Sequence, residues 1–530
     1  MSYFPGEPKI SSFGLPFLFF TPLPLSLPLL FLKPFQEGAS ITRPVLDREK
    51  SIPLPLAARL TRIRALLCTL VVFSGLLEFM QGYSRAPVYS GGAVALVALP
   101  VIFPVVSKST RVIVSILLLG GMAAAISSGN LEPGLFVESF NEMSPLVALV
   151  AAAMLLGMAL QLGRFAALFN RFYTCTASLY RPYIISLLIS FILSFLSVLG
   201  AVAPSYYLVN ENLKKLGLAE NSRFQTTSIA RGFAMAVTVS PAAATVGIAL
   251  KYSGLSWPKA AGPFFLLSLA GLSAAFFVES SWRSTKALAP PSKPAPDPAR
   301  SVGTSREDTG DTGGSFAKRL LSFFLLFAGV IVTISFLGNV LHFSSLNSIS
   351  AGCLLVTFVW GALSGNLQPV LSGAFSFFNE GITKLSDQFA LFVTAGFFTF
   401  FMERSGTLEW IGYFVEKASG MVGTAALLSL LPPVIIFLSM IGLHPFASGI
   451  IIAKALLLSP LYLNPLAMAT ALMSGMSMAY LVSPFSGLTL LLVSLSGKSP
   501  YSIGIRWNFF FMIAFLLLTS LFITLATICS

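Results

Sequence analysis

A set of helix-breaking marks occurs twice in this chain and limits the folds open to it. The hexapeptide SGNLEP at 128–133 returns as SGNLQP at 364–369, and the pattern GxxMAxxVSP at 232–241 returns at 475–484. Gly475 follows Gly232 by 243 residues, and the closing Ser-Gly pair of the second copy follows that of the first by the same interval. The SGN marks lie 236 residues apart, so the matches keep their order while the interval between the copies drifts slowly, which indicates two copies of one unit.

The composition places both copies in a membrane. Hydrophobic residues make up 55% of the chain, charged residues make up 10%, and the mean hydropathy is +0.84. No single water-soluble core can hide so much apolar surface. A membrane helix needs roughly 20 apolar residues. Runs of this kind lie at 63–82, 88–106, 111–127, 144–163, 261–280, 319–341, 347–364, 386–403 and 509–528, and two longer, broken stretches lie at 183–254 and 424–497.

The net charge of +13 indicates membrane topology and not nucleic-acid binding. The basic residues lie in short connections and tails. Examples are Arg59, Arg62 and Arg64, near the start of the first apolar run. Under the positive-inside rule such connections are cytoplasmic, so we expect the N-terminus inside and the connection that holds Glu132 outside. The four cysteines lack pair spacing and predict neither a disulfide framework nor a zinc site. No cofactor is expected beyond Na⁺ or H⁺ as a coupling ion.

Changes in composition divide the chain into five parts. Residues 1–45 form a proline-rich extension, which we expect to be disordered or interfacial because its prolines deny a helix its hydrogen bonds. Residues 46–87 hold an extra first transmembrane helix, and 88–280 form the first repeat. Residues 281–318 form a cytoplasmic flexible linker rich in Pro, Gly, Ser and Asp, and 319–530 form the second repeat.

Each repeat predicts about five transmembrane helices, a re-entrant hairpin and a broken helix. The hairpins are expected at 183–215 and 424–460, each entering and leaving the membrane on one side. Five is an odd number of crossings, so the second repeat begins on the opposite side of the membrane and is inverted relative to the first. The extra helix raises the total to eleven crossings and leaves the C-terminus outside. The predicted fold class is an all-α polytopic membrane protein with two inverted-topology repeats.

The interruptions mark the candidate site. Gly and Pro leave backbone N–H and carbonyl groups without helical partners. Because hydrocarbon cannot solvate such groups, an interruption inside the membrane is too costly unless the groups line a cavity or meet a ligand. Unwound carbonyls and hydroxyls near such a break bind ions and substrates in transporters. The alternatives are a kinked helix satisfied by its neighbours and hydroxyls that serve helix packing. The candidate substrate- or ion-binding residues are Ser197, Gly200, Pro204, Ser240, Pro241 and Thr245 in the first repeat, and Ser439, Gly442, His444, Pro445, Ser483, Pro484 and Thr489 in the second.

Three ionisable residues near the interruptions have two interpretations each. Charged residues at membrane depth usually have a function, so Arg231 and Lys454 could balance the charge of an anionic substrate. The alternative is that their side chains snorkel to a membrane interface. His444 either couples proton movement or binds substrate, since its imidazole changes charge near neutral pH, or is a buried histidine satisfied by a carbonyl group.

Paired hairpins, each followed by a broken helix in inverted copies, resemble the ion transporter superfamily, which includes divalent anion–sodium symporters and TRAP large subunits. The segments GLHP at 442–445, SPFSG at 483–487 and RWN at 506–508 are also similar to bacterial proteins of this kind without an assigned substrate. The resemblance covers roughly residues 88–528 and implies an elevator-type motion against a scaffold that dimerises. The symporters carry a Ser-Asn-Thr triplet at each hairpin tip. Here the tips read LGA at 199–201 and GLH at 442–444, so the resemblance does not extend to sodium dependence or dicarboxylate specificity.

We therefore expect a secondary active transporter, and not an enzyme, in the bacterial cytoplasmic membrane. It would carry a small anion such as an organic acid, driven by sodium or protons, and its partners would be that solute, the bilayer and a second copy in a homodimer. A membrane enzyme acting on a lipid or isoprenoid phosphate needs clustered acids and histidines, which are few and scattered here. A passive channel predicts a ring of like groups around an axis. Neither alternative explains two interrupted copies.

Overall fold

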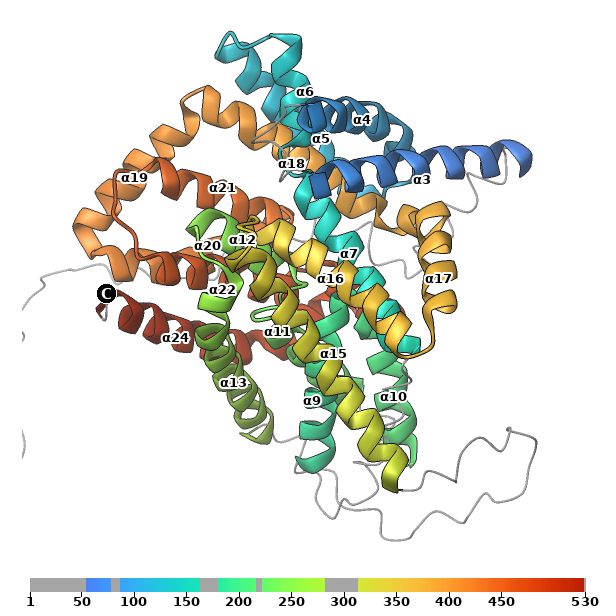
Figure 1. The fold of residues 1–530 in the computed structure, drawn as a ribbon. Coiled ribbons are helices and arrows are strands. Elements are labelled where there is room, and N and C mark those ends of the chain that lie inside the picture. Colours follow the sequence, from blue (N-terminus) through green and yellow to red (C-terminus); the bar gives the residue numbers. More distant parts are fainter. Residues whose placement is uncertain (1–53, 78–85, 163–179, 216–221, 282–312, 529–530) are drawn as a thin grey trace, which may run out of the picture. The chain divides into compact units, whose positions relative to one another are not determined.

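The computed structural model describes residues 54–77, 86–162, 180–215, 222–281 and 313–528 (Figure 1). Every regular element within these ranges is a helix, and ten of the helices are long and apolar enough to cross a bilayer. The predicted extension at 1–45 and most of the predicted linker at 281–318 lie outside the described residues. The described part of the chain is an all-α polytopic membrane protein, as predicted.

The first described helix, α3 (Leu54–Leu76), begins earlier than the apolar run expected at 63–82. Its early start brings Arg59, Arg62 and Arg64 into the helix, and α3 is not among the ten apolar spans found in the described residues. The Arg64 Nε donates a hydrogen bond of 3.1 Å to the Val101 carbonyl oxygen. The eleventh crossing expected for 46–87 therefore remains a prediction.

The two repeats follow one order of elements. The first repeat consists of α4 (Ala86–Ile102), η3 (Phe103–Val105), α5 (Lys108–Ser127), α6 (Pro133–Asn141), α7 (Ser144–Leu162), α9 (Tyr180–Ser197), η4 (Val198–Ala201), α10 (Val202–Lys215), α11 (Ser222–Ala236), α12 (Ala244–Ser253) and α13 (Trp257–Ser281). The second consists of α15 (Gly313–Asn339), α16 (Ser345–Leu363), α17 (Leu367–Asn379), η5 (Gly381–Leu385), α18 (Ser386–Arg404), α19 (Thr407–Val422), α20 (Thr424–Ile441), α21 (Pro445–Leu458), α22 (Pro465–Val482), α23 (Gly487–Ser496), η6 (Ser502–Arg506) and α24 (Trp507–Ile528).

The contacts of α18 show that the repeats are inverted. The helix α6, which leads into α7, runs opposite to α18, because Phe136 packs on Phe401 with ring centroids 5.0 Å apart and Phe140 stacks on Phe397 at 4.9 Å. A Cβ on Gly396, earlier still in α18, would meet Met143 at the start of α7. Since α18 is the counterpart of α7 in the second repeat, the same element runs in opposite directions in the two copies.

The two repeats also pack reciprocally. Helix α5 packs on α18 while its counterpart α16 packs on α7. The Ser477 hydroxyl of α22 donates a hydrogen bond of 2.7 Å to the Ala234 carbonyl oxygen of α11, across a sequence separation of 243 residues. That separation equals the repeat interval between Gly232 and Gly475. Two equivalent positions therefore touch, and the approximate two-fold axis between the repeats passes through this crossing of α11 and α22.

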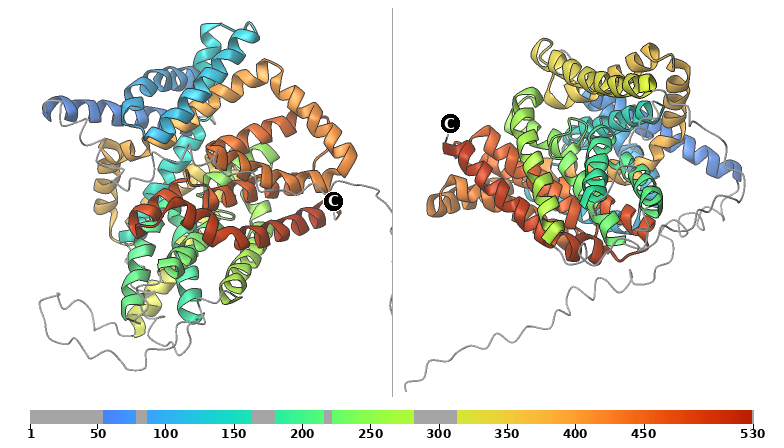
Figure 2. Two further views of the ribbon diagram at one scale, coloured as in Figure 1. Left: turned by 180° about the vertical axis from the view of Figure 1, so that it is seen from behind. Right: turned by 90° about the horizontal axis from the view of Figure 1, so that it is seen from below.

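Apart from α3 and α19, the helices form two groups that each pack mainly within themselves. The frame group consists of α4–α7 and α15–α18, and the hairpin group consists of α9–α13 and α20–α24. Within the hairpin group, α9 and α10 lie side by side as the arms of the first hairpin, and α20, α22 and α24 lie together (Figures 1 and 2). Contacts of α7 with α9 and η4, and of α18 with α21, join the two groups.

Candidate functional site

The first hairpin breaks at its tip, as expected from Gly200. Helix α9 ends at Ser197, and the tight turn η4 separates it from α10. A Cβ on Gly200 would lie 2.7 Å from the Ser197 hydroxyl oxygen, so only glycine fits there without movement. Val198 has a φ of +46°, which is a strained conformation for a β-branched residue. Pro204 lies in the first turn of α10, where it needs no hydrogen-bonding N–H.

The second hairpin breaks at Gly442, whose φ of +120° favours glycine. His444 is the N-cap of α21, and its Nδ1 accepts a hydrogen bond of 3.3 Å from the Phe446 N–H. The buried imidazole also packs against Phe446 and Tyr480, with ring centroids 4.8 Å and 5.8 Å away. Pro445 occupies the first position of α21. The geometry thus gives His444 a capping role, which neither of the two sequence interpretations included.

The serines of the two helix breaks bind the ends of the hairpin arms. The Ser240 hydroxyl donates to the Phe195 carbonyl oxygen near the end of α9. In the second repeat the Ser483 hydroxyl donates 2.8 Å to the carbonyl oxygen of Ser439, near the end of α20. Each break therefore satisfies a carbonyl group that the neighbouring hairpin tip leaves without a helical partner. Pro241 and Pro484 follow these serines, between the two halves of each broken helix.

Three further candidate hydroxyls bind backbone or neighbouring hydroxyl groups. Thr245 donates 2.5 Å to the Val237 carbonyl oxygen at the end of α11. Ser439 donates 2.8 Å to Ile435 within α20. Thr489 accepts a hydrogen bond of 3.0 Å from Ser486. Donation to the backbone leaves the oxygen lone pairs of Thr245 and Ser439 available as acceptors.

The two breaks differ at the start of their second halves. In the second repeat the Ser486 side chain caps α23 by accepting from the Thr489 N–H at 3.1 Å. The equivalent position in the first repeat, 243 residues earlier, is Ala243, and α12 has no side-chain cap. No side chain of the N-cap residue therefore accepts a hydrogen bond from the first N–H groups of α12. Because a helix N-terminus carries partial positive charge, this end of α12 favours a negatively charged group.

A cavity of about 150 Å³ lies where the first hairpin tip, the uncapped end of α12 and the frame group meet. It brings together Ser197, Gly200 and Thr245 of the predicted residues. The predicted residues Pro204, Ser240, Pro241, Ser439, Gly442, His444, Pro445, Ser483, Pro484 and Thr489 do not line it. Its other walls come from α7, from η5 and the start of α18, and from Phe446 and Tyr480. The cavity thus lies on the boundary between the hairpin group and the frame group.

Two polar residues of this cavity are absent from the sequence-based candidates. Lys384, which is exposed, and Gln388 come from η5 and α18, four residues apart. The Gln388 Oε1 atom is buried and has no hydrogen-bond partner. The sequence did carry a signal, because Lys384 is the one basic residue in the connection at 365–385 and Gln388 follows it one helical turn later.

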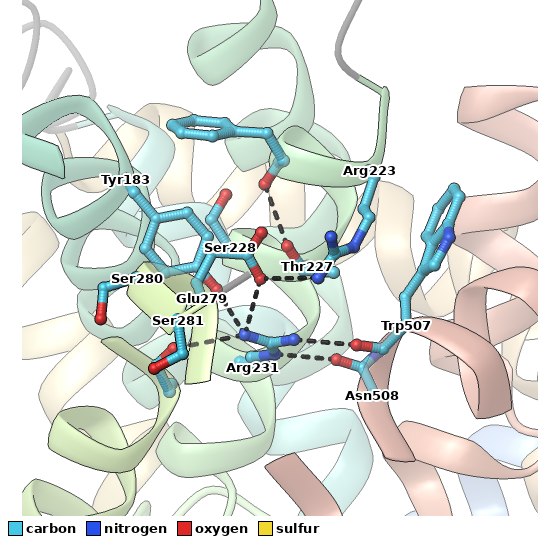
Figure 3. A network of polar contacts seen from close by, with 12 residues as sticks. Tyr183, Arg223, Thr227, Ser228, Arg231, Glu279, Ser280, Ser281, Trp507 and Asn508 are labelled. Carbon is cyan, nitrogen blue, oxygen red and sulfur yellow. Dashed lines mark hydrogen bonds and ion pairs between the residues drawn. The ribbon is translucent and has the colours of Figure 1, made fainter. Parts of the chain in front are cut away.

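Arg231 lies away from the cavity, in a fully buried polar network (Figure 3). Its guanidinium donates 3.1 Å to Glu279 Oε2, 3.0 Å to the Tyr183 hydroxyl and 2.9 Å to Asn508 Oδ1. Further bonds reach the carbonyl oxygens of Ala275 and Trp507. These partners occupy the guanidinium from three helices, so Arg231 joins α9, α11, α13 and α24 and is not free to bind an anion.

Lys454 lies in an ion-pair cluster between the two groups. Its ammonium lies 3.0 Å from Glu403 Oε2 of α18 and 3.2 Å from Glu142 Oε1 at the end of α6. Lys251 of α12 donates 3.3 Å to the Glu142 carbonyl oxygen. The Lys454 side chain is 7% exposed. Lys454 therefore neutralises protein carboxylates in this conformation.

Comparison with known proteins finds a structural likeness and no family. No protein-family model matches the sequence, and no curated protein matches it. Among solved structures, the chain is similar to the Alcanivorax borkumensis YdaH transporter, whose crystal structure was described as having an unusual topology. The sequence identity is 15%, the TM-score is 0.48, and the match covers 79% of this chain and 98% of that one.

Proposed function

We propose that this protein is a secondary active transporter that carries a small anion, such as an organic acid, across the bacterial cytoplasmic membrane. The observation that carries the proposal is the cavity at the first hairpin tip. Its walls come from both helix groups, it holds one cationic side chain, Lys384, and it adjoins the uncapped N-terminus of α12. Substrate sites of secondary transporters lie at such interrupted helices in repeat-built folds.

The position of the cavity supports an elevator-type mechanism. Ser197, Gly200 and Thr245 belong to the hairpin group, whereas Lys384 and Gln388 belong to the frame group. A sliding of the hairpin group would carry one wall of the cavity away from the other and expose the solute on the opposite side. The frame group would remain in place and form the contact of a homodimer. The hydroxyl lone pairs and carbonyl groups near the breaks would hold the coupling ion, sodium or a proton.

The proposal is tested with purified protein in liposomes. Labelled carboxylates and inorganic anions are offered under an imposed sodium or proton gradient, and we expect gradient-driven uptake of at least one of them. Ala153 of α7 is 4% exposed and lines the cavity, so Ala153→Leu should fill part of the space and abolish uptake. Ala123→Leu, on an exposed position of α5, is the matched control. An absence of gradient-driven flux for every anion would refute the proposal.

A further inference from the structure

The charge of the cavity limits what it can hold. Lys384 is the one charged side chain that lines it, and within the described residues no carboxylate lies within ion-pair distance of its ammonium. A carboxylate that leaves water to enter the cavity is costly to bury unless it is paired with a cation. One cation therefore suits one carboxylate. A second carboxylate on the solute would lack a charged partner, and an ammonium on the solute would find no acid among the lining residues.

A second feature is the unused acceptor of Gln388. Its Oε1 atom is buried without a hydrogen-bond partner, and the side chain lines the cavity. Buried polar atoms in proteins are nearly always paired, and those that are not deserve an explanation. A carbonyl oxygen accepts and does not donate. The missing partner is therefore a hydrogen-bond donor. Because no acidic side chain lines the cavity to pair with a cation, an uncharged donor such as a hydroxyl group meets that description.

The size and the walls of the cavity complete the description. Val150, Ala153, Met154, Phe233 and Leu385 give the rest of the lining an apolar character. The volume is about 150 Å³, and a cavity of roughly 150 Å³ in another protein holds benzene. A solute of about six non-hydrogen atoms fits such a space.

From these three features we infer that the cavity binds a short hydroxy monocarboxylate, with its carboxylate facing Lys384 and its hydroxyl donating to Gln388 Oε1. This inference rests on the proposed function, because it names the cargo of the same site. It makes Lys384 the residue that selects for negative charge and Gln388 the residue that selects for the hydroxyl group.

The test compares five small probes by isothermal titration of the full-length protein in detergent, which requires no transport. Lactate carries one carboxylate and one hydroxyl. Propionate lacks the hydroxyl, pyruvate replaces it with a carbonyl, alanine replaces it with an ammonium, and malonate carries a second carboxylate. We expect lactate to bind about tenfold more tightly than propionate, because propionate leaves the Gln388 oxygen unpaired. Equal or tighter binding of pyruvate, alanine or malonate would overturn the inference.

Two variants assign the roles. Gln388→Leu should bring the affinity ratio of lactate to propionate to about one, and Gln388→Met repeats the test with a longer side chain if the first variant does not fold. Lys384→Met should weaken both probes equally, whereas Lys417→Met, on an exposed position of α19, should weaken neither. A tenfold lactate preference that survives both Gln388 variants would disprove the role of this residue. Lactate binding without flux refutes transport alone, and flux of another anion without lactate binding refutes the inference alone.

Discussion

At the scale of single residues, the polar groups inside this membrane protein divide into those that hold helices together and those that face the cavity. Arg231 belongs to the first kind, since Glu279 and Asn508 lie 48 and 277 residues away in sequence and yet meet its guanidinium. Such partners cannot be predicted from a local pattern. The sequence located the buried arginine but offered only a substrate or an interface as its partner, because pairing between distant helices is set by tertiary packing.

Arg231→Lys should destabilise the protein without altering the cavity. A lysine keeps the charge but loses the planar fork that reaches Glu279, Tyr183 and Asn508 together. Leaving buried acceptors unpaired in such a network costs about 3 kcal/mol. The measurement is the thermal unfolding temperature of the detergent-solubilised protein, with Arg506→Lys, at an exposed position of the same region, as control. Equal unfolding temperatures for Arg231→Lys and the wild type would contradict the structural role.

At the scale of elements, the glycine marks that identified the repeat are packing positions. A Cβ on Gly232 would lie 2.5 Å from the Leu187 carbonyl oxygen of α9, and a Cβ on Gly475 would lie 2.9 Å from the Pro432 Cα of α20. In each repeat the broken helix therefore lies directly against the first arm of the hairpin. The sequence predicted the breaks because Gly and Pro weaken helices, although Pro100, Pro263 and Pro432 lie inside helices that continue. It missed Lys384 and Gln388 because an unbroken helix start gives no such mark.

Gly232→Ala and Gly475→Ala should both lower stability, by about 1 to 3 kcal/mol each, since the added methyl group meets backbone atoms that cannot move aside. Gly262→Ala in α13 is the matched control, because nothing lies within 4 Å of its Cβ position. That substitution should be neutral or stabilising by up to about 1 kcal/mol. Thermal unfolding in one detergent compares all three variants, and tolerance at both repeat positions would show that the arms are not in close contact.

The ion pairs of Lys454 join α21 to the frame group and must break if the hairpin group slides. Lys454→Met should therefore reduce stability by about 2 kcal/mol, less than for a fully buried pair, because the Glu403 side chain is 45% exposed. Adding Glu142→Gln should recover part of the loss, since it removes one uncompensated carboxylate. Lys417→Met should leave the unfolding temperature unchanged. If the loss of stability in the double variant equals the sum of the losses in the two single variants, Lys454 and Glu142 do not interact.

At the scale of the whole molecule, the architecture is an inverted pair of repeats whose helices are shared between a frame group and a hairpin group. The order of the long apolar helices was predictable, because apolar length and duplicated marks are local properties of the sequence, whereas the shorter helices α17 and α19 were not predicted. The side-by-side placement of equivalent positions on α11 and α22 was not, since it depends on how the two copies meet. The position of this cavity beside the break of the first repeat was also unpredictable, because both breaks carry the same Ser-Pro mark.

Inversion predicts that matching loops react on opposite sides of the membrane. Glu132 and Gln368 occupy the same place in the SGNLEP and SGNLQP marks, and both are exposed. In a variant without native cysteines, Glu132→Cys should react with a membrane-impermeant maleimide in intact cells. Gln368→Cys should react only after permeabilisation. Labelling of both cysteines from one side would contradict the opposite orientation of the repeats.

An elevator motion predicts that a link between the groups stops transport. A Cβ on Gly247 of α12 would lie 2.7 Å from a methyl group of Leu346 on α16, so Gly247→Cys with Leu346→Cys joins the hairpin group to the frame group. A short, cleavable cross-linker should block flux in liposomes, and cleavage should restore it. The control pair, Gly121→Cys with Phe397→Cys, lies within the frame group and should tolerate the link. Unchanged flux across the first pair would exclude a sliding of the two groups.

The hydrogen bond from Ser477 to Ala234 has a consequence for how such a chain arises. Consider a shorter ancestor with only one unit that inserted into the membrane in both orientations and paired with itself. The residue at the position of Ala234 and Ser477 would then have faced the same residue of the second copy. A large side chain at this position would have met a second large side chain at the helix crossing. Small residues survive there in both halves today, Ala234 in one and Ser477 in the other. The present pair is thus the arrangement that a self-pairing half-length protein would have required before gene fusion.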